Sequence, residues 1–158
     1  MTFVAEKDPG LIPQVLSKIL DSCVNGVTLA DPDLDDMPIV YANKAFENMT
    51  GYSQEEILGH NCRFLQGEDR EQDARYQLRQ AIDNSEPAEV TIRNYRKDGQ
   101  LFYNHLMISP LFDSNGNVIY YLGVQYDVTN QVTAAEEIKR LSDSLELLSR
   151  KKSEQLKA

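Results

Sequence analysis

The sequence predicts an α+β fold, with one five-stranded antiparallel sheet, helices gathered on one face and a further helix at each end of the chain. Two observations predict this fold. Strand-like and helix-like segments follow one another in the order two strands, short helices, one longer helix and three strands. The turn dipeptides Asp98-Gly99 and Asn115-Gly116 separate the last three strands, so both connections are expected to be hairpins.

Hydrophobic spacing and capping signals define the elements of the first half of the chain. Leu11, Val15 and Ile19 recur at helical spacing, which predicts an amphipathic helix in front of the core. Ser53 begins a Ser-Gln-Glu-Glu capping box, which predicts the start of a helical turn. The expected elements are a helix at 11–21, strands at 26–30 and 39–42, a helix at 44–50 and one helical turn ending at Gly59.

The second half of the chain is predicted to hold the longer helix and the three-stranded meander. Leu78 and Ile82 share one face of a segment that is otherwise rich in charges, as in an amphipathic helix. The expected elements are a helix at 71–83 and strands at 88–97, 100–111 and 118–128.

The segment after Thr129 has a different composition from the core, because residues 131–158 contain no Gly, Pro or aromatic residue. Its apolar residues alternate three and four apart, which is the seam of a coiled coil, and they are Ile138, Leu141, Leu145 and Leu148. We therefore expect a flanking helix at 1–22, a core at 23–129 and a coiled-coil-like linker helix at 130–158.

A lone helix of this kind is marginal in water, so the seam is expected to have a partner. The partner is either the outer face of its own sheet or the same helix of a second chain. About two heptads are too short to hold a dimer unaided. We expect Leu11, Val15 and Ile19 of the first helix to add to a homodimer interface.

Composition excludes several classes of function. A net charge of -9 over 158 residues argues against direct binding to nucleic acid or to an anionic membrane. Cys23 and Cys62 are the only cysteines, with no CxxC and no His cluster, so neither a disulfide scaffold nor a metal site is expected. This cysteine usage, with no apolar run long enough to cross a bilayer, fits a reducing cytoplasm.

One heptapeptide carries most of the chemical information: Asn61-Cys62-Arg63-Phe64-Leu65-Gln66-Gly67. It places a thiol beside a fixed cation and puts amide side chains on both flanks. Because a neighbouring cation favours the thiolate, Cys62 is predicted to be activated. Cys23 is interpreted as a small buried hydrophobic residue.

Amide side chains also gather on one face of the predicted sheet. A two-residue turn at Asn115-Gly116 pairs Leu106 with Gln125 and puts Asn104 on the same face. Asn94 lies on this face too if the Asp98-Gly99 turn carries one extra residue. The amides then lie on an apolar surface with Val90 and Ile92, where a ligand with a row of donors and acceptors would satisfy them.

Two arginines extend this predicted site. Arg63 follows the cysteine and Arg79 lies on the longer helix, so their guanidinium groups could converge on a phosphate. For Arg79 alone, a solvated helix charge is the more frequent outcome, as expected for Arg70 and Arg75.

Over residues 24–129 the chain resembles the flavin-binding light-oxygen-voltage (LOV) photosensors, a branch of the PAS superfamily, through the heptapeptide and the strand motifs Arg93-Asn94-Tyr95, Phe102-Tyr103-Asn104 and Gly123-Val124-Gln125. The resemblance implies a PAS fold and a bound FMN. It assigns the photoactive role to Cys62 and the phosphate to Arg63 and Arg79. The full set of expected flavin contacts is Thr28, Asn61, Arg63, Leu65, Gln66, Arg79, Val90, Ile92, Asn94, Asn104, Leu106 and Gln125. Ala30 is also expected to line the flavin.

The resemblance further implies a photochemical cycle without substrate turnover. Blue light would drive the Cys62 sulfur onto flavin C4a while N5 gains a proton, and the bond would break again in the dark. The Gln125 amide would then present oxygen to N5 instead of nitrogen, and the change would pass through the sheet to the terminal helix. An effector joined after Ala158, or a separate partner protein, would read it.

Two other classes of function remain open from the sequence. A flavin oxidoreductase would use Cys62 as a redox thiol, but it would need a second thiol or an open substrate site. A PAS-type module for another small ligand, for redox sensing or for dimerisation alone would need no photochemistry. An absorption spectrum that bleaches in blue light and recovers in the dark would support the photosensor alone.

Overall fold

A computed structural model of the chain describes residues 12–157. Its elements follow the predicted order: α1 (Ile12–Ser22), β1 (Gly26–Ala30), β2 (Ile39–Ala42), α2 (Lys44–Thr50), α3 (Gln54–Ile57), a short 3-10 helix η2 (Cys62–Gln66), α4 (Asp73–Asp83), β3 (Ala88–Tyr95), β4 (Leu101–Phe112), β5 (Val118–Asp127) and α5 (Thr129–Lys157). Leu11, which the sequence placed in the first helix, lies outside the described residues.

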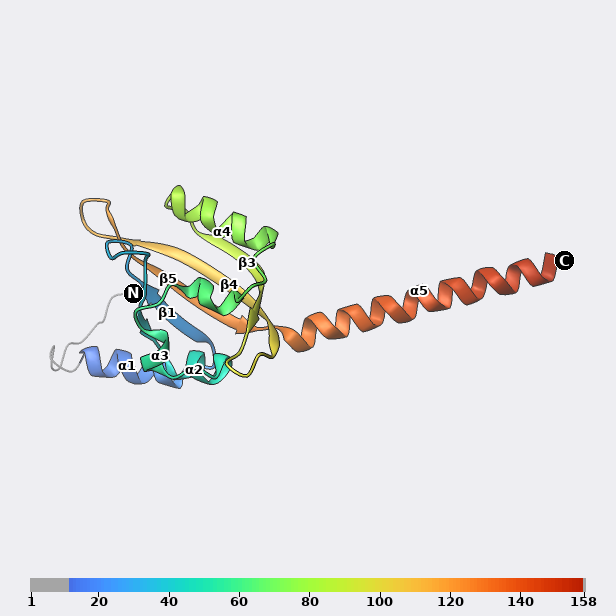
Figure 1. Cartoon of the computed structure of the whole chain (residues 1–158), viewed down its shortest axis with the longest axis horizontal. Helices are drawn as coiled ribbons and strands as arrows, with labels where there is room; N and C mark the ends of the chain where they lie inside the picture. The colour runs from blue at the N-terminus through green and yellow to red at the C-terminus, as the bar shows by residue number, and fades with distance from the viewer. Residues whose placement is uncertain (1–11, 158) are drawn as a thin grey trace.

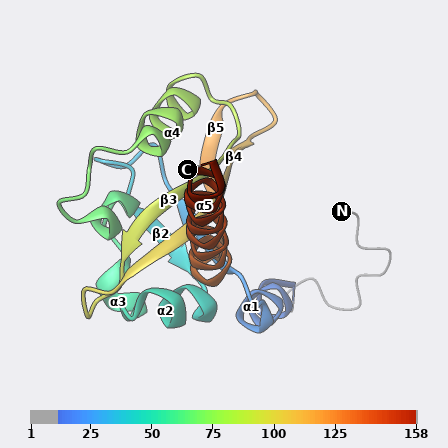
Figure 2. The same ribbon diagram turned by 90° about the vertical axis from the view of Figure 1, so that its right-hand side faces the viewer.

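The strands form one antiparallel sheet in the order β2-β1-β5-β4-β3. Figures 1 and 2 show α2, α3 and α4 gathered on one face of this sheet. The predicted α+β fold, with helices on one face of a five-stranded sheet, is confirmed. The last three strands pair in sequence, while β1 inserts beside β5 and brings the two ends of the core together.

The strand register puts the predicted amides on one face. Leu106 lies opposite Gln125 across β4 and β5, as expected. Across β3 and β4, Asn94 lies opposite Phe102 and Ile92 opposite Asn104, so the turn carries the extra residue that Asn94 required. All three amide side chains are buried on the face that the helices cover.

The connection between β4 and β5 differs from the predicted two-residue turn. The Asp113 N–H donates to the Asn117 carbonyl at 2.8 Å, and the Asp113 carboxylate accepts from the N–H groups of Asn115 and Asn117. The strands resume pairing at Phe112 and Val118, so the loop is odd in length. A register shift next to Phe112 compensates for the odd loop, which is why the pairing of Leu106 with Gln125 survives.

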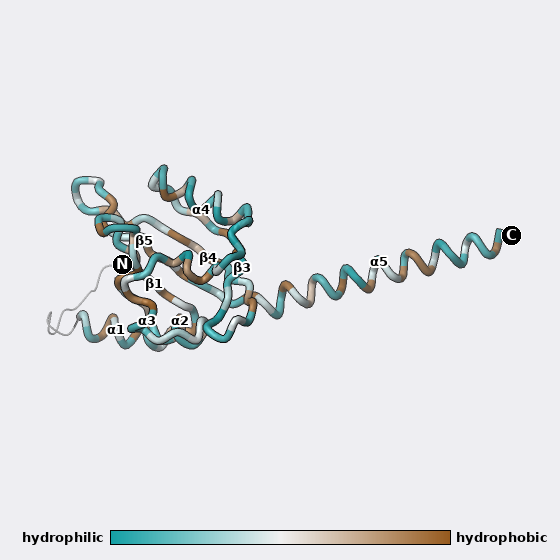
Figure 3. The backbone as a smooth tube through the Cα atoms, in the orientation of Figure 1, coloured by the Kyte–Doolittle hydropathy of each residue, from teal (hydrophilic) through white to brown (hydrophobic). Residues whose placement is uncertain are grey.

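The apolar core consists of two clusters on this face. One joins α2, α3, η2 and β2 through Ile39, Ala42, Phe46, Ile57 and Leu65. The other packs α4 on the sheet through Ala74, Ala81, Val90, Ile92, Leu106 and Ile108. Figure 3 shows the hydrophobic segments of the strands alternating with hydrophilic ones, as expected for a sheet covered on one face.

Asn43 joins three elements at the start of the core. Its side chain is fully buried, and its Oδ1 accepts from the N–H groups of Val27 and Phe46 at 2.8 and 3.1 Å. Its Nδ2 donates to the carbonyls of Leu20 and Asn25 at 2.8 and 3.0 Å. One amide therefore caps α2 and also ties it to β1 and to the end of α1.

The terminal helix α5 is anchored only at its base in the described structure. The Thr129 Oγ1 accepts from the Tyr103 N–H at 3.0 Å, and the Val128 N–H donates to the Tyr103 carbonyl at 2.9 Å. The Asp127 carboxylate accepts from the Thr129 N–H and from Arg96. Beyond these contacts α5 projects away from the core, so it does not pack on the outer face of its own sheet (Figure 1).

The flanking helices expose apolar side chains. The predicted seam residues of α5 are 49–68% exposed, and on α1 Val15 and Ile19 are 47% and 52% exposed. Across residues 12–157 the helices are too short or too polar to cross a membrane.

Candidate binding cavity

A cavity of about 280 Å³ lies between the inner face of the sheet, η2 and α4. The structure brings most of the predicted site residues to its wall: Thr28, Ala30, Asn61, Cys62, Arg63, Gln66, Arg79, Ile92, Asn94, Asn104, Leu106 and Gln125. These residues come from separated parts of the chain, so the fold assembles the site rather than any one motif.

Two predicted contacts do not line this cavity. Leu65 packs into the cluster of Ile39, Phe46 and Ile57, and Val90 packs into the cluster beneath α4. Leu65 therefore supports the wall from behind, whereas Val90 lies on the inner face of the sheet, opposite Leu106 and beneath α4, beside the residues that line the cavity. The heptapeptide forms a 3-10 helix, whose turns point Cys62 and Gln66 to the cavity and Leu65 into the core.

Cys62 is half-buried at the start of η2, and burial of its thiol raises the pKa to about 11. The predicted activation by Arg63 is therefore wrong. The Arg63 guanidinium forms an ion pair with the Asp36 carboxylate, which neutralises the cation that would have favoured a thiolate. The loss of hydration that a thiolate would suffer on burial outweighs the effect of the neighbouring Arg63 cation. Cys62 is therefore a protonated thiol at neutral pH.

Asn61 holds the loop beside Cys62. Its Oδ1 accepts from the Arg63 N–H at 3.0 Å and caps η2, while its Nδ2 donates to the carbonyls of Asp36 and Met37 at 2.7 and 3.3 Å. Asp36 and Met37 have positive φ angles of 63° and 45°, which Asp tolerates and Met rarely adopts. The Asn61 amide thus stabilises a strained turn at the cavity mouth.

The buried amides leave several oxygen atoms without a partner. The Asn104 Nδ2 donates to Asn94 Oδ1 at 3.1 Å, and the Asn94 Nδ2 donates to the Arg93 carbonyl at 3.0 Å. Within residues 12–157, Asn104 Oδ1, Gln125 Oε1 and Gln66 Oε1 are buried and accept no hydrogen bond. Unpaired buried acceptors are costly, so these oxygen atoms fit a ligand that donates to them.

Gly123 gives the Gln125 side chain its room. The Gln125 Nε2 donates to Thr28 Oγ1 at 3.0 Å across the sheet. A Cβ atom on Gly123 would lie 2.6 Å from that hydroxyl oxygen and 2.8 Å from the Gln125 nitrogen. A side chain at this position would break the hydrogen bond and fill the cavity floor.

Three arginines line the cavity. Arg63 and Arg79 were predicted there, and Arg75 joins them from α4, where the sequence suggested a solvated charge. Arg75 and Arg79 are four residues apart on the same helix and therefore share a face, so this spacing could have predicted that Arg75 lies beside Arg79. Three guanidinium groups from two elements suit an anionic group.

Sequence analysis did not assign several other wall residues: Met37, Ile39, Leu78, Ile82, Ile108, Tyr121 and Gly123. Strand alternation could have found Ile108 and Gly123, because they lie opposite each other two residues beyond the Leu106 and Gln125 pair. Tyr121 follows from the same alternation, two residues before Gly123 on β5, but the hydrogen bond from its hydroxyl to the Ile82 carbonyl of α4, at 3.0 Å, could not have been predicted.

The comparisons with known proteins agree with this fold and cavity. Residues 24–130 match the PAS domain family. The chain is 41% identical over 135 residues to a blue-light photoreceptor of Listeria monocytogenes, a match covering 85% of this chain and 53% of that protein. The chain therefore spans about half the length of that relative.

Two solved structures extend the likeness. The LOV domain of a blue-light-activated histidine kinase from Erythrobacter litoralis is 48% identical, with a TM-score of 0.63, over 66% of this chain and 96% of that one. An RNA-binding light-oxygen-voltage receptor is 37% identical, with a TM-score of 0.80, over 90% of this chain and 40% of that one.

A five-stranded sheet with helices folded over a cavity on one face is the architecture of a PAS domain. Within that superfamily the chain belongs to the LOV domains, the blue-light sensory branch, and the family resemblance carried by the heptapeptide is confirmed.

Proposed function

We propose that this chain is a non-enzymatic blue-light sensor that holds FMN in the cavity and signals through a reversible bond between the flavin and Cys62. The observation that carries the proposal is the meeting of a protonated thiol with buried, unpaired amide oxygens in one cavity. A redox thiol would need a second cysteine nearby, and Cys23 lies outside the residues that line the cavity.

Three kinds of wall residue support FMN as the ligand. Asn94, Asn104 and Gln125 offer both donors and acceptors, as the pyrimidine edge of the isoalloxazine requires. Ile92 and Leu106 supply apolar surface for the rings. Arg63, Arg75 and Arg79 supply charge for the phosphate, which favours FMN over riboflavin.

The flavin, when bound, supplies blue-light absorption and an excited state that is electrophilic towards a thiol. Cys62 supplies both the sulfur nucleophile and a proton, because its thiol is neutral at physiological pH. With flavin held in the cavity, the Cys62 sulfur would bond to ring C4a and the thiol proton would pass to ring N5. Both would return to Cys62 in the dark, so nothing would be consumed.

Gln125 detects the change in the ring. In the described structure its Nε2 donates to Thr28, and its Oε1 is free to accept. A protonated ring N5 would be a donor, and the Gln125 amide would then have to present its oxygen to it, by rotation or tautomerisation. Because Gln125 lies on β5, this change occurs two residues before Asp127, which caps the base of α5.

We also propose that α5 passes the signal on through a homodimer. The exposed seam of α5 and the exposed apolar residues of α1 would find partners on a second copy. A C-terminal effector domain or a separate protein would then respond to a change in helix orientation.

Absorption spectroscopy on the full chain tests the photochemical proposal. The parent, loaded with FMN, should show a structured flavin band that bleaches in blue light and recovers in the dark. Cys62→Ala should keep the band and lose the reversible bleach, whereas Cys23→Ala should behave as the parent. A Cys62→Ala variant that still bleaches reversibly would overturn the role of Cys62.

A further inference from the structure

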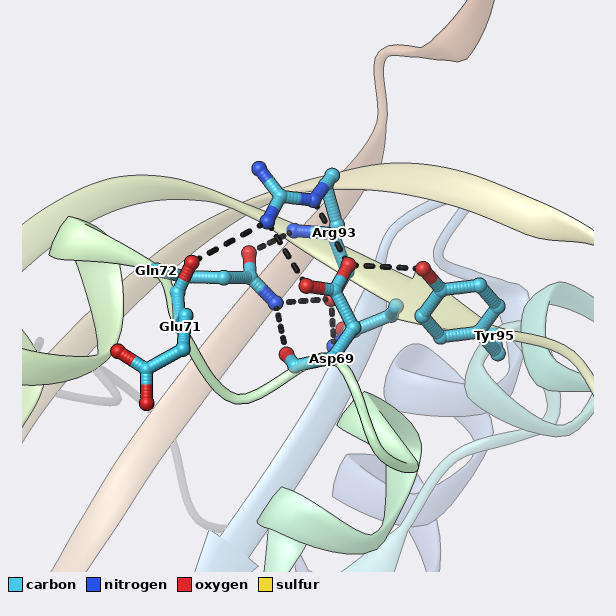
Figure 4. Close-up of polar contacts among 6 residues, drawn as sticks. Asp69, Glu71, Gln72, Arg93 and Tyr95 are labelled. Atoms are coloured by element: carbon cyan, nitrogen blue, oxygen red, sulfur yellow. Dashed lines mark hydrogen bonds and ion pairs between the residues drawn. The ribbon is translucent and has the colours of Figure 1, made fainter.

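A polar cluster at the free edge of the sheet lies outside the cavity wall and is unexplained by the proposed light cycle. It consists of Asp69, Gln72, Arg93 and Tyr95, and we name it the edge clamp (Figure 4). β3 is the last strand of the sheet, so its outward N–H and C=O groups need partners other than a strand.

Gln72 takes the place of a neighbouring strand at this edge. Its Oε1 accepts from the Arg93 N–H at 2.8 Å, and its Nε2 donates to the Arg93 carbonyl at 3.1 Å. Gln72 occupies the N-cap position of α4, yet its side chain turns to β3 instead of capping the helix. The side chain is only 6% exposed, so these hydrogen bonds are shielded from water.

Asp69 fixes the same strand through side chains. Its carboxylate accepts two hydrogen bonds from the Arg93 guanidinium at 2.7 and 2.8 Å, and one from the Tyr95 hydroxyl at 2.7 Å. These bonds, first from Arg93 and then from Tyr95, lower the pKa of Asp69 to about 2, so the carboxylate is charged at neutral pH. The clamp therefore holds the loop between η2 and α4 against β3.

The Arg93 carbonyl connects the clamp to the cavity. It accepts from Gln72 on the outside and from the Asn94 Nδ2 on the inside, at 3.1 and 3.0 Å. With its nitrogen held there, the Asn94 amide turns its Oδ1 to the Asn104 Nδ2. That contact in turn leaves Asn104 Oδ1 buried without a partner among the described residues, on a side chain that lines the cavity.

We infer that Gln72 and Asp69 are positioning residues that fix the orientation of the Asn94 and Asn104 amides towards the flavin. The inference rests on the proposed FMN site. The clamp fixes the Arg93 peptide, and the peptide decides which end of the Asn94 amide faces the strand and which faces Asn104. Without the clamp both amides can rotate, and their match to the ring edge is lost for part of the time.

The test compares Gln72→Met with the parent and with Gln80→Met, all as full chains loaded with FMN in the dark. Methionine keeps the length of glutamine and removes both hydrogen bonds to the Arg93 peptide, together with the one that the Gln72 Nε2 donates to the Asp69 carbonyl at 2.7 Å. Gln80 is a matched control because it is an exposed glutamine on the same helix. The measurements are hydrogen exchange at the Arg93 amide, the infrared bands of the flavin carbonyls and the FMN dissociation constant.

Gln72→Met should speed exchange at Arg93, shift or broaden the flavin carbonyl bands and raise the dissociation constant about three- to tenfold, the range expected for loss of a buried hydrogen bond. Gln80→Met should leave all three at parent values. If Gln72→Met does not fold, Asp69→Asn decides the matter, because it keeps the side-chain shape and removes the charge that holds Arg93.

Faster exchange at Arg93 with unchanged carbonyl bands and unchanged FMN binding would overturn the inference, because the clamp would then serve the fold alone. A parent chain without a flavin band would instead overturn the proposed function and this inference with it.

Discussion

Cys62 illustrates how burial decides the state of a single reactive residue. The pKa of its thiol rises from an ordinary value near 9.0 to about 11, and the adjacent Arg63 does not prevent this because it is paired with Asp36. A neutral thiol keeps the proton that the proposed cycle requires. The heptapeptide predicts which residue reacts, whereas only the folded surroundings indicate the protonation state of its thiol.

The raised pKa of Cys62 predicts a dependence of stability on pH. The folded chain holds the thiol proton more tightly than the unfolded chain, so this contribution is fully present below about pH 9 and is lost as the pH rises towards 11. This thiol should lower the unfolding free energy of the parent by up to about 2.7 kcal/mol over that pH range, and Cys62→Ala should not show that part of the fall. Urea unfolding of both chains at pH 8 and pH 11 measures the two free energies of unfolding. An equal fall in both chains between these pH values would contradict the prediction.

Gln125 carries a second prediction at the residue scale. Gln125→Leu removes the hydrogen bond to Thr28 and the free oxygen that we place against the ring. The bond between Cys62 and the flavin should still form, because attack by sulfur needs no amide. The absorption and emission bands should shift, and light-dependent changes outside the core should weaken. Spectra identical to the parent would place Gln125 away from the flavin.

At the scale of elements, Asn43 has a role that the sequence could not reveal. Three of its partners, Leu20, Asn25 and Val27, lie 16 to 23 residues earlier in the chain. Local pattern identifies Asn43 only as a residue in front of a helix, and α2 was predicted without reference to it. Folding adds the contacts that make it a junction between α1, β1 and α2.

Replacement of Asn43 should therefore destabilise the chain strongly. Asn43→Ala leaves two buried N–H groups and two carbonyls without their partner, which should lower the unfolding free energy by about 3 kcal/mol or more. Asn48→Ala, at an exposed position of the same helix, is the matched control and should change it by less than about 0.5 kcal/mol. Chemical denaturation measures both, and equal effects would show that the buried amide adds little.

Some features of the strands and loops could be predicted from the sequence and others could not. Strand pairing around Leu106 and Gln125 follows from alternation, and the three buried amides follow from pairing. The odd length of the loop after Phe112 could not be predicted from the sequence. The extra loop residue and the register shift next to Phe112 cancel each other, so the pattern of buried residues is unchanged. Val90 was assigned to the site by strand alternation, and it does lie on the inner face, but its burial under α4 rather than at the cavity depends on packing. The direction of the Leu65 side chain also depends on packing.

At the scale of the whole molecule, the core and α5 differ in how they are held. The core has two packed clusters, whereas α5 exposes its apolar residues along a length of 29 residues. Such a helix needs a second surface, and a second copy of the chain provides an identical one.

The full chain should therefore be a dimer, and a chain ending near Asn130 should be a monomer or a weaker dimer. Light scattering in the dark and under blue light, at tens of micromolar protein, measures both. If both are monomers in both conditions, the homodimer proposal fails and α5 must bind a different surface.

The attachment of α5 by its first residues alone has a mechanical consequence. At 1.5 Å per residue, 29 residues make a rigid arm about 43 Å long. A change of one degree at Asp127 would move the far end by about 0.75 Å, so the sheet need shift very little to move whatever is joined beyond it. Each residue added to or removed from the arm would turn the attached domain by about 100° around the helix axis. The polarity of the response to light would then depend on how many residues the helix contains.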